Sequence, residues 1–259
     1  MEKEGKYIYC VVGTEHERNF GHIGVGGNGA EVMTIGYDDI SMVVSNHPMG
    51  KIIVSRENML THEKVVEKVM GEFDGVLPVR FGTIASSADE IRNLLDRRYR
   101  EFSDALTYVD HKVELGVKGL WVDMSAVFEE ITEENKDIKS ARDKIKKEKG
   151  PPDKNNVQAK IEVGKMVEQA LLRKKEEETE MIAQVLRKMA VDHKLNKTLD
   201  DKMFMNAAFL VSKGRGLEFD NVMDELSGRH KNRIKFMYAG PLPPYNFVNL
   251  AIYPKSWEV

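Results

Sequence analysis

The chain has 259 residues, 41% of them apolar, and its 39 basic and 42 acidic residues give a formal net charge of -3. This near balance excludes a global charge excess that would attract nucleic acid or an anionic membrane. The sequence lacks the uncharged apolar run of roughly 18 residues that a spanning helix needs, and its acidic N-terminus does not resemble a secretory signal, so we expect a cytoplasmic protein without direct membrane insertion.

The start of the chain predicts a small sheet. Apolar runs of strand length lie at 6–13, 31–35 and 40–44, with a turn at 36–39 between the last two. Cys10 lies in the first run and is the single cysteine, so it cannot form an internal disulfide. We expect a buried, unreactive thiol.

A glycine-rich segment separates the first two runs. Residues 22–30 contain glycine at positions 24, 26, 27 and 29, which favours a flexible connection between strands. The accessible backbone amides of Gly24 to Gly29 also fit a phosphate-binding loop. The segment lacks a Gly-Lys-Ser/Thr ending, and no helix follows directly, so we favour the connection.

Two helices and an edge segment complete the predicted N-terminal α+β domain, residues 1–110. The apolar spacing predicts helices over 56–72, capped by Ser55, and over 87–106, where Ser87 and Glu90 form a capping box. Between them, Pro78 restricts the apolar run 76–83 to an edge strand or an irregular extended segment.

The second half, residues 111–259, approximates a ferredoxin-like domain. A strand is predicted at 112–122, and a charged, weakly amphipathic helix within 124–149 that stops at Gly150-Pro-Pro-Asp153. A long helix follows at 156–193. The remaining predicted elements are a strand at 203–211, a turn at 213–216, a helix at 217–226 and a strand at 233–239. Compared with a ferredoxin-like unit, one element is altered or missing. The fold class is therefore α+β, with two domains and a long helical excursion in the second.

Catalytic and metal-binding patterns are weak. His62-Glu63 begins like the H-E-x-x-H zinc motif, but Val66 occupies the second ligand position, and the other histidines are scattered. Cys10 has no nearby base in sequence, and no serine lies in a G-x-S-x-G motif. The basic cluster at 97–100 is diluted by acidic neighbours, which disfavours nucleic-acid binding. We predict no catalytic residues, no metal and no cofactor, and therefore a protein that is not an enzyme.

Two proline-containing segments remain. Arg80 lies in the run after Pro78, so we expect its guanidinium to be partly buried with a carboxylate or carbonyl partner. Near Gly240 the last strand should end, because proline lacks an N–H donor and has a fixed φ. Residues 241–245 fit a polyproline ligand for an aromatic groove or, as we favour, a rigid cover that packs on its own domain and closes the C-terminal domain.

Four stretches in order resemble the gas vesicle protein GvpL/GvpF family. They are Tyr7-Ile-Tyr-Cys-Val-Val12, Leu77-Pro-Val-Arg-Phe-Gly-Thr83, Val113-Glu-Leu-Gly-Val-Lys118 and Tyr238-Ala-Gly-Pro-Leu-Pro-Pro-Tyr-Asn-Phe247. The resemblance covers nearly the whole chain, and the departures from it are the segments 22–30 and 124–149. The residues that carry the family signature are Pro78, Arg80, Phe81, Gly82, Gly240, Pro241, Pro243, Pro244 and Tyr245.

The resemblance implies a minor gas vesicle component without known catalytic residues. It implies an N-terminal α+β domain that contacts the small hydrophobic shell protein GvpA, and a modified ferredoxin-like C-terminal domain. Nucleation or building of the vesicle wall, contacts with other gas vesicle proteins and a location in the gas vesicle follow as expectations. The alternative from the residues is a small-ligand or nucleotide-responsive module that uses Gly24 to Gly29, and a true enzyme would require an unrecognised site.

Overall fold

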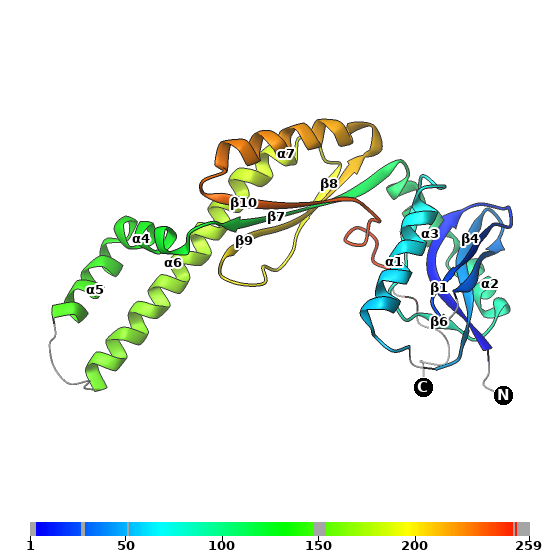
Figure 1. Ribbon diagram of the computed structural model, residues 1–259, viewed down its shortest axis with the longest axis horizontal. Coiled ribbons are helices and arrows are strands. Elements are labelled where there is room, and N and C mark those ends of the chain that lie inside the picture. The colour runs from blue at the N-terminus through cyan, green and yellow to red at the C-terminus, as the bar shows by residue number, and fades with distance from the viewer. Residues whose placement is uncertain (1–3, 27–28, 51, 148–153, 251, 253–259) are drawn as a thin grey trace. The chain divides into compact units, whose positions relative to one another are not determined.

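The computed structural model describes residues 4–26, 29–50, 52–147, 154–250 and 252, and Figure 1 shows its helices and strands. The chain divides into two compact units. Unit 1 contains residues 1–115, 210–214 and 240–259, and unit 2 contains 116–209 and 215–239. The predicted division at residue 110 is therefore close to one boundary, but the chain also returns to unit 1 twice later on.

Unit 1 is built on a six-stranded sheet with the order β2-β3-β4-β1-β5, in which β6 also pairs with β1. Its strands are β1 (Glu4–Gly13), β2 (Asn19–Gly24), β3 (Ala30–Tyr37), β4 (Ile40–Pro48), β5 (Val76–Pro78) and β6 (Ile84–Ala85). Residues 7–12 of β1 are all fully buried, because helices cover both faces of the sheet. This double burial explains why β1 is a continuous apolar run in the sequence.

Three helices cover this sheet. They are α1 (Arg56–Met70), α2 (Ala88–Arg97) and α3 (Tyr99–Val109). Helix α1 packs with Val65, Val66 and Val69 on one face, and the other two pack on the opposite face. The Ser55 side chain accepts from the Asn58 amide at the start of α1, as the sequence predicts. The prediction of one helix over 87–106 is wrong in one respect. The structure has two helices there, α2 and α3, which are separated at Arg98.

The prediction of an irregular connection over 22–30 is also partly wrong. Residues up to Gly24 form the edge strand β2, which pairs antiparallel with β3. Glycine obscured this strand because it has low strand propensity. At Gly24 the fold requires glycine, since a Cβ atom there would lie 2.7 Å from the Ala30 carbonyl oxygen and 2.7 Å from the Tyr9 hydroxyl. Positions 27 and 28 of the segment lie outside the described residues.

The second sheet has four strands in the order β10-β7-β9-β8. They are β7 (Lys112–Trp121), β8 (Asp192–Leu195), β9 (Met203–Ser212) and β10 (Ile234–Leu242), with α7 (Gly216–His230) between β9 and β10. Helices between β7 and β8 and between β9 and β10 make this a ferredoxin-like arrangement. The element that the sequence seemed to lack is β8, whose first two residues the prediction had included in the long helix.

Between β7 and β8 the chain forms a helical excursion within unit 2. It consists of α4 (Met124–Glu134), α5 (Lys136–Lys147) and α6 (Lys154–Leu186), and α5 packs against α6 (Figure 1). Helix α6 has 33 residues, or about 50 Å at 1.5 Å per residue. The single helix predicted within 124–149 is two helices with a break at Asn135, while the predicted stop at 150–153 lies outside the described residues.

The segment after Tyr238 differs from the prediction. Strand β10 continues past Gly240 to Leu242, with a cis Gly240–Pro241 peptide bond, and as an edge strand it tolerates a proline. From Gly240 onward the chain belongs to unit 1, so the predicted closure of the C-terminal domain is wrong. The Asn246 amide donates to the buried Glu114 carboxylate at 2.8 Å, which fixes the segment in unit 1.

Candidate functional site

The described residues contain no group of three or more His, Cys, Asp or Glu side chains that could hold a metal ion. The Cys10 thiol is fully buried, and burial raises its pKa, as expected for an unreactive cysteine. Among the helices that the structure describes, none combines the length and the apolar character needed to cross a membrane. The surface of unit 1 offers a different kind of site.

An apolar groove of about 580 Å³ lies on unit 1, and we call it the β6 groove. Two stretches of chain line it, one between β4 and α1 and one that leads into β6. The lining residues are Met49, Gly50, Ile52, Val54, Phe81, Gly82 and Ile84. The lining residue Val54 and its neighbour Ile53 are 75% and 77% exposed, so apolar surface at the groove is open to solvent. Exposed apolar surface of this kind is typical of a binding site.

The wall formed by residues 79–84 has a fixed backbone. Pro78 is buried and paired with Cys10 of β1, and the Thr83 hydroxyl donates to the Arg80 carbonyl oxygen at 2.7 Å. Gly82 has a φ of +87°, a conformation that glycine adopts without strain. The signature residues Pro78, Phe81 and Gly82 therefore shape this wall.

Beneath the wall lies a buried cluster of aromatic rings. The Tyr7 hydroxyl contacts His62 Nδ1 at 2.8 Å and accepts a hydrogen bond from the Gly82 amide at 3.2 Å. The Phe81 ring lies edge-on to His62, with centroids 5.7 Å apart. The Tyr245 hydroxyl is close enough to contribute to the raised pKa of Tyr7, whose main cause is burial. The two proline-containing segments of the sequence therefore approach each other at Tyr7.

His62 was not singled out as a core residue from the sequence, although it is only 2% exposed. Burial lowers its pKa to about 4, which outweighs the opposing effect of the nearby Val79 backbone. The ring is therefore neutral near pH 7. The spacing in the sequence could have indicated this burial. His62 precedes the buried Val65, Val66 and Val69 by three, four and seven residues, so all four share one helix face.

Arg80 contradicts the sequence-based expectation. Its side chain is exposed, and its guanidinium makes no hydrogen bond or ion pair with any described residue. The four residues before it, 76–79, are all buried, and the chain reaches the surface at Arg80. The predicted internal partner is therefore wrong.

The second signature segment lies against β7. Gly240 has a φ of +148°, and a Cβ atom there would lie 2.5 Å from the Leu115 Cδ2 atom, so this position requires glycine. Pro243 and Pro244 are buried, Pro241 is exposed and Tyr245 is 40% exposed. These residues pack within unit 1 and do not line the β6 groove.

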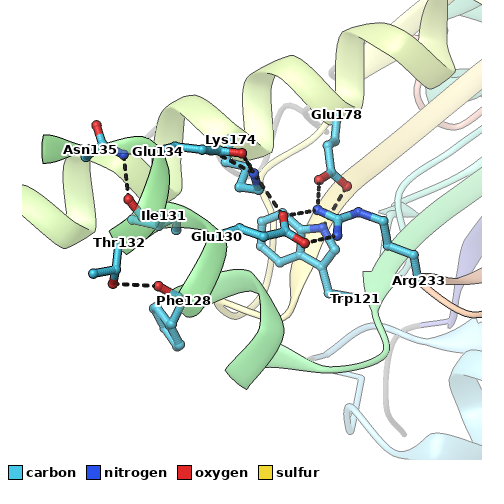
Figure 2. A network of polar contacts seen from close by, with 10 residues as sticks. All are labelled: Trp121, Phe128, Glu130, Ile131, Thr132, Glu134, Asn135, Lys174, Glu178 and Arg233. Atoms are coloured by element: carbon cyan, nitrogen blue, oxygen red, sulfur yellow. Dashed lines mark hydrogen bonds and ion pairs between the residues drawn. The ribbon is translucent and has the colours of Figure 1, made fainter. Parts of the chain in front are cut away.

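A network of charged side chains lies in unit 2 (Figure 2). Arg233, just before β10, donates to both carboxylate oxygens of Glu130 on α4 at 2.6 and 2.8 Å, and to Glu178 on α6 at 2.5 Å. The buried Trp121 indole N–H donates to the other Glu178 oxygen at 2.7 Å, and Lys174 pairs with Glu130 at 3.0 Å. The hydrogen bonds from Arg233 are the main reason that the pKa of Glu130 is lowered.

This network attaches the helical excursion to the sheet. It joins Glu130 of α4 and both Lys174 and Glu178 of α6 to residues at the ends of β7 and β10. The Thr179 hydroxyl adds a hydrogen bond to the Phe204 carbonyl oxygen at 2.8 Å. No titratable group of the network lies free in a closed pocket. Its geometry is that of a structural clamp.

Comparison with known proteins places these features in a family. The model of the family "Gas vesicle synthesis protein GvpL/GvpF" matches residues 5–249. Gas vesicle protein F of Dolichospermum flosaquae is 27% identical over 215 residues, which cover 82% of this chain and 85% of that protein. Gas vesicle protein F1 of Halobacterium salinarum is 24% identical over 251 residues, covering 96% and 95% respectively.

Solved structures share the fold. The crystal structure of GvpF from Anabaena sp. PCC7120 matches with a TM-score of 0.81 at 23% identity, covering 96% of this chain and 100% of that chain. GvpF from Microcystis aeruginosa matches with a TM-score of 0.76. The α+β fold predicted from the sequence is confirmed. Because the family model spans nearly the whole sequence, the chain belongs to the GvpL/GvpF family of gas vesicle synthesis proteins.

Proposed function

We propose that this gas vesicle protein binds the major shell protein GvpA through the β6 groove and helps to nucleate or build the vesicle wall. The observation that supports the proposal most strongly is the groove itself. Its described lining residues are uncharged and mostly apolar, and the lining residue Val54 and its neighbour Ile53 are more than 70% exposed. Family membership supplies the gas vesicle context.

The physical reason for such a partner is the chemistry of a gas-filled compartment. A shell subunit needs an apolar surface toward the gas, and before assembly that surface is liable to aggregate in water. A protein with an exposed apolar groove can cover part of it transiently and release it to the growing wall. This role needs binding and release but no bond-making step, so we propose a non-enzymatic assembly factor that acts at the gas vesicle.

Co-purification of the full chain with GvpA tests the proposal. Val54→Asp places a charge in the groove lining at a position that is 75% exposed, so the fold should tolerate it. We expect at least about a tenfold loss of GvpA binding, because a carboxylate desolvated in an apolar contact is costly. Leu217→Asp, at a 74% exposed position of unit 2, is the matched control and should bind normally.

Two outcomes would contradict the proposal. If the wild-type chain does not associate with GvpA under any condition, the proposed partner is wrong. If both aspartate variants lose binding equally, the contact does not use the β6 groove. A circular dichroism spectrum of each variant confirms that the fold is intact.

A further inference from the structure

The arginine side chains of unit 1 differ in whether they contact other residues. Arg92 and Arg98 form ion pairs with carboxylates three residues away in sequence. Arg97 donates to the Asn93 carbonyl oxygen, and Arg18 stacks over Phe73. Three others, Arg56, Arg80 and Arg100, are exposed and make no contact of these kinds with any described residue. These three arginines differ in how close they lie, in sequence, to the residues that line the β6 groove.

Two of these three arginines lie within two positions, in sequence, of residues that line the β6 groove. Arg80 directly precedes the lining residue Phe81, and Arg56 follows the lining residue Val54 by two positions. They therefore sit beside the two stretches of chain that form the groove. Arg100 lies on α3, which packs on the opposite face of the sheet from α1.

The backbone that carries Arg80 is held in place, so this cation is offered at a defined position. Its carbonyl oxygen accepts from Thr83, and Val79 before it is buried with its amide bonded to the Tyr9 carbonyl oxygen at 2.9 Å. A guanidinium on a fixed backbone loses less freedom on binding than one on a mobile loop. Arginine next to a desolvated apolar contact is also a common source of binding energy.

We propose that Arg80, assisted by Arg56, selects a partner segment that combines apolar side chains with a carboxylate. The apolar side chains fill the β6 groove, where none of the described lining residues is charged, and the carboxylate accepts hydrogen bonds from Arg80. The inference rests on the proposed function in taking this segment from the shell protein. Arg80 has no partner among the described residues, so its guanidinium is available for this contact.

Arg80→Glu in the full chain tests this selection. The variant should lose at least about tenfold in GvpA affinity, because the carboxylate then faces a like charge. Wild-type binding should weaken as salt rises, whereas binding of Arg80→Glu should not. Arg100→Glu is the matched control with the same change of charge, and it should retain wild-type affinity and salt dependence.

Synthetic peptides separate the inference from the proposed function. Tiled GvpA peptides are compared with copies in which every Asp and Glu is replaced by Asn and Gln. A second probe pair has no gas vesicle sequence and consists of one apolar peptide with either two Glu or two Lys residues. Wild type should prefer the carboxylate form of each pair, and Arg80→Glu should reverse the Glu/Lys preference.

The outcomes are distinct. If GvpA binds wild type and Arg80→Glu equally, the selection by Arg80 is wrong while shell-protein binding stands. If GvpA fails to bind but the Glu peptide is preferred through Arg80, the proposed function is wrong while the selectivity stands. If Arg80→Glu instead changes the mass of the chain in solution, a second copy occupies the groove and the proposal is overturned.

Discussion

Tyr7 is the residue at which the most distant parts of unit 1 meet. Its hydroxyl accepts from Gly82, contacts His62 of α1 and lies near Tyr245 of the C-terminal segment. A buried tyrosine with several polar partners fixes their relative positions better than an apolar ring, because each hydrogen bond has a preferred direction. The wall of the β6 groove is therefore supported from below by side-chain contacts of defined geometry.

The first prediction concerns pH and His62. Burial lowers the pKa of the ring from 6.5 to about 4, so the unfolded chain binds this proton more tightly than the folded chain. The stabilising contribution is complete above about pH 6.5 and is lost as the pH falls toward 4, by about 3 kcal/mol in total. His62→Phe should remove this part of the pH dependence.

Urea unfolding at about pH 7 and about pH 4.5 measures this difference. The loss of unfolding free energy between the two pH values should be smaller in His62→Phe than in wild type. His16→Gln, whose side chain is 76% exposed in wild type, should behave like wild type and serves as the control. Equal losses in wild type and His62→Phe would show that the ring is not the titrating group.

At the scale of elements, the clamp around Arg233 holds α4 and α6 on the second sheet. Most of α6 beyond the clamp is exposed toward its N-terminal end, where Val157 and Ile161 are 49% and 47% exposed. A long helix with a partly polar surface gains little stability from its own propensity. Its attachment to the sheet therefore depends on the residues near Glu178. There, Glu178 pairs with Arg233 and accepts from the Trp121 indole, and Thr179 donates to a backbone carbonyl oxygen.

The second prediction concerns the stability that unit 2 loses when the guanidinium of Arg233 is removed. Arg233→Leu leaves the Glu178 carboxylate, whose side chain is 11% exposed, without its ion-pair partner. We expect the free energy of unfolding of unit 2 to fall by about 2–3 kcal/mol. Tryptophan fluorescence in urea measures this loss in a Trp257→Phe background, where Trp121 in the same network is the remaining indole.

Arg229→Leu is the matched control for this variant. Its ion pair with Glu225 joins side chains that are 61% and 64% exposed, so its loss should cost less than about 1 kcal/mol. If the two variants are equally destabilised, the clamp has no special role. The Glu178→Gln variant, which keeps the volume but removes the charge, should lie between them.

Some elements were predictable because their signals are local. The doubly buried β1, the Ser55 cap and the turn at 36–39 depend on neighbours in sequence, and the fold class followed from them. Strand β8, by contrast, has the sequence Asp192-His-Lys-Leu and lacks buried apolar residues, so it resembled the end of a helix. Its strand conformation comes from pairing with β9, which is tertiary information.

The site was harder to predict than the fold. The sequence identified Pro78 to Gly82 as a special segment, but it supplied no reason to join that segment to Met49, Ile52 and Val54. The Arg233 clamp likewise links residues that are 103 and 55 positions apart. The guanidinium of Arg80 was assigned an internal partner because only the structure shows which way the side chain points.

For the whole molecule, the third prediction concerns the return of the chain to unit 1. Deleting residues 240–259 removes Phe247 and Ile252, which are 9% and 8% exposed, and leaves the buried Glu114 without Asn246. We expect unit 1 to lose about 3 kcal/mol or more. Hydrogen exchange should show faster exchange of the β1 amides, whereas amides in the middle of α6 should keep their protection.

The α6 amides provide the control within the same sample, since they belong to the other unit. Unchanged protection of β1 would show that the C-terminal segment does not stabilise unit 1. Loss of protection in both units at once would show that the segment supports the whole chain. Either result would contradict the assignment of this segment to unit 1 alone.

Because residues 240–252 complete the unit that contains the β6 groove, the order of synthesis matters. N-terminal domains commonly fold first while the rest of the chain is still being made. Here the last segment of unit 1, from Gly240 onward, is translated only after all of unit 2. A nascent chain would therefore hold unit 1 without the buried side chains of Phe247 and Ile252, and without the contact between Asn246 and Glu114, until translation of unit 2 is complete.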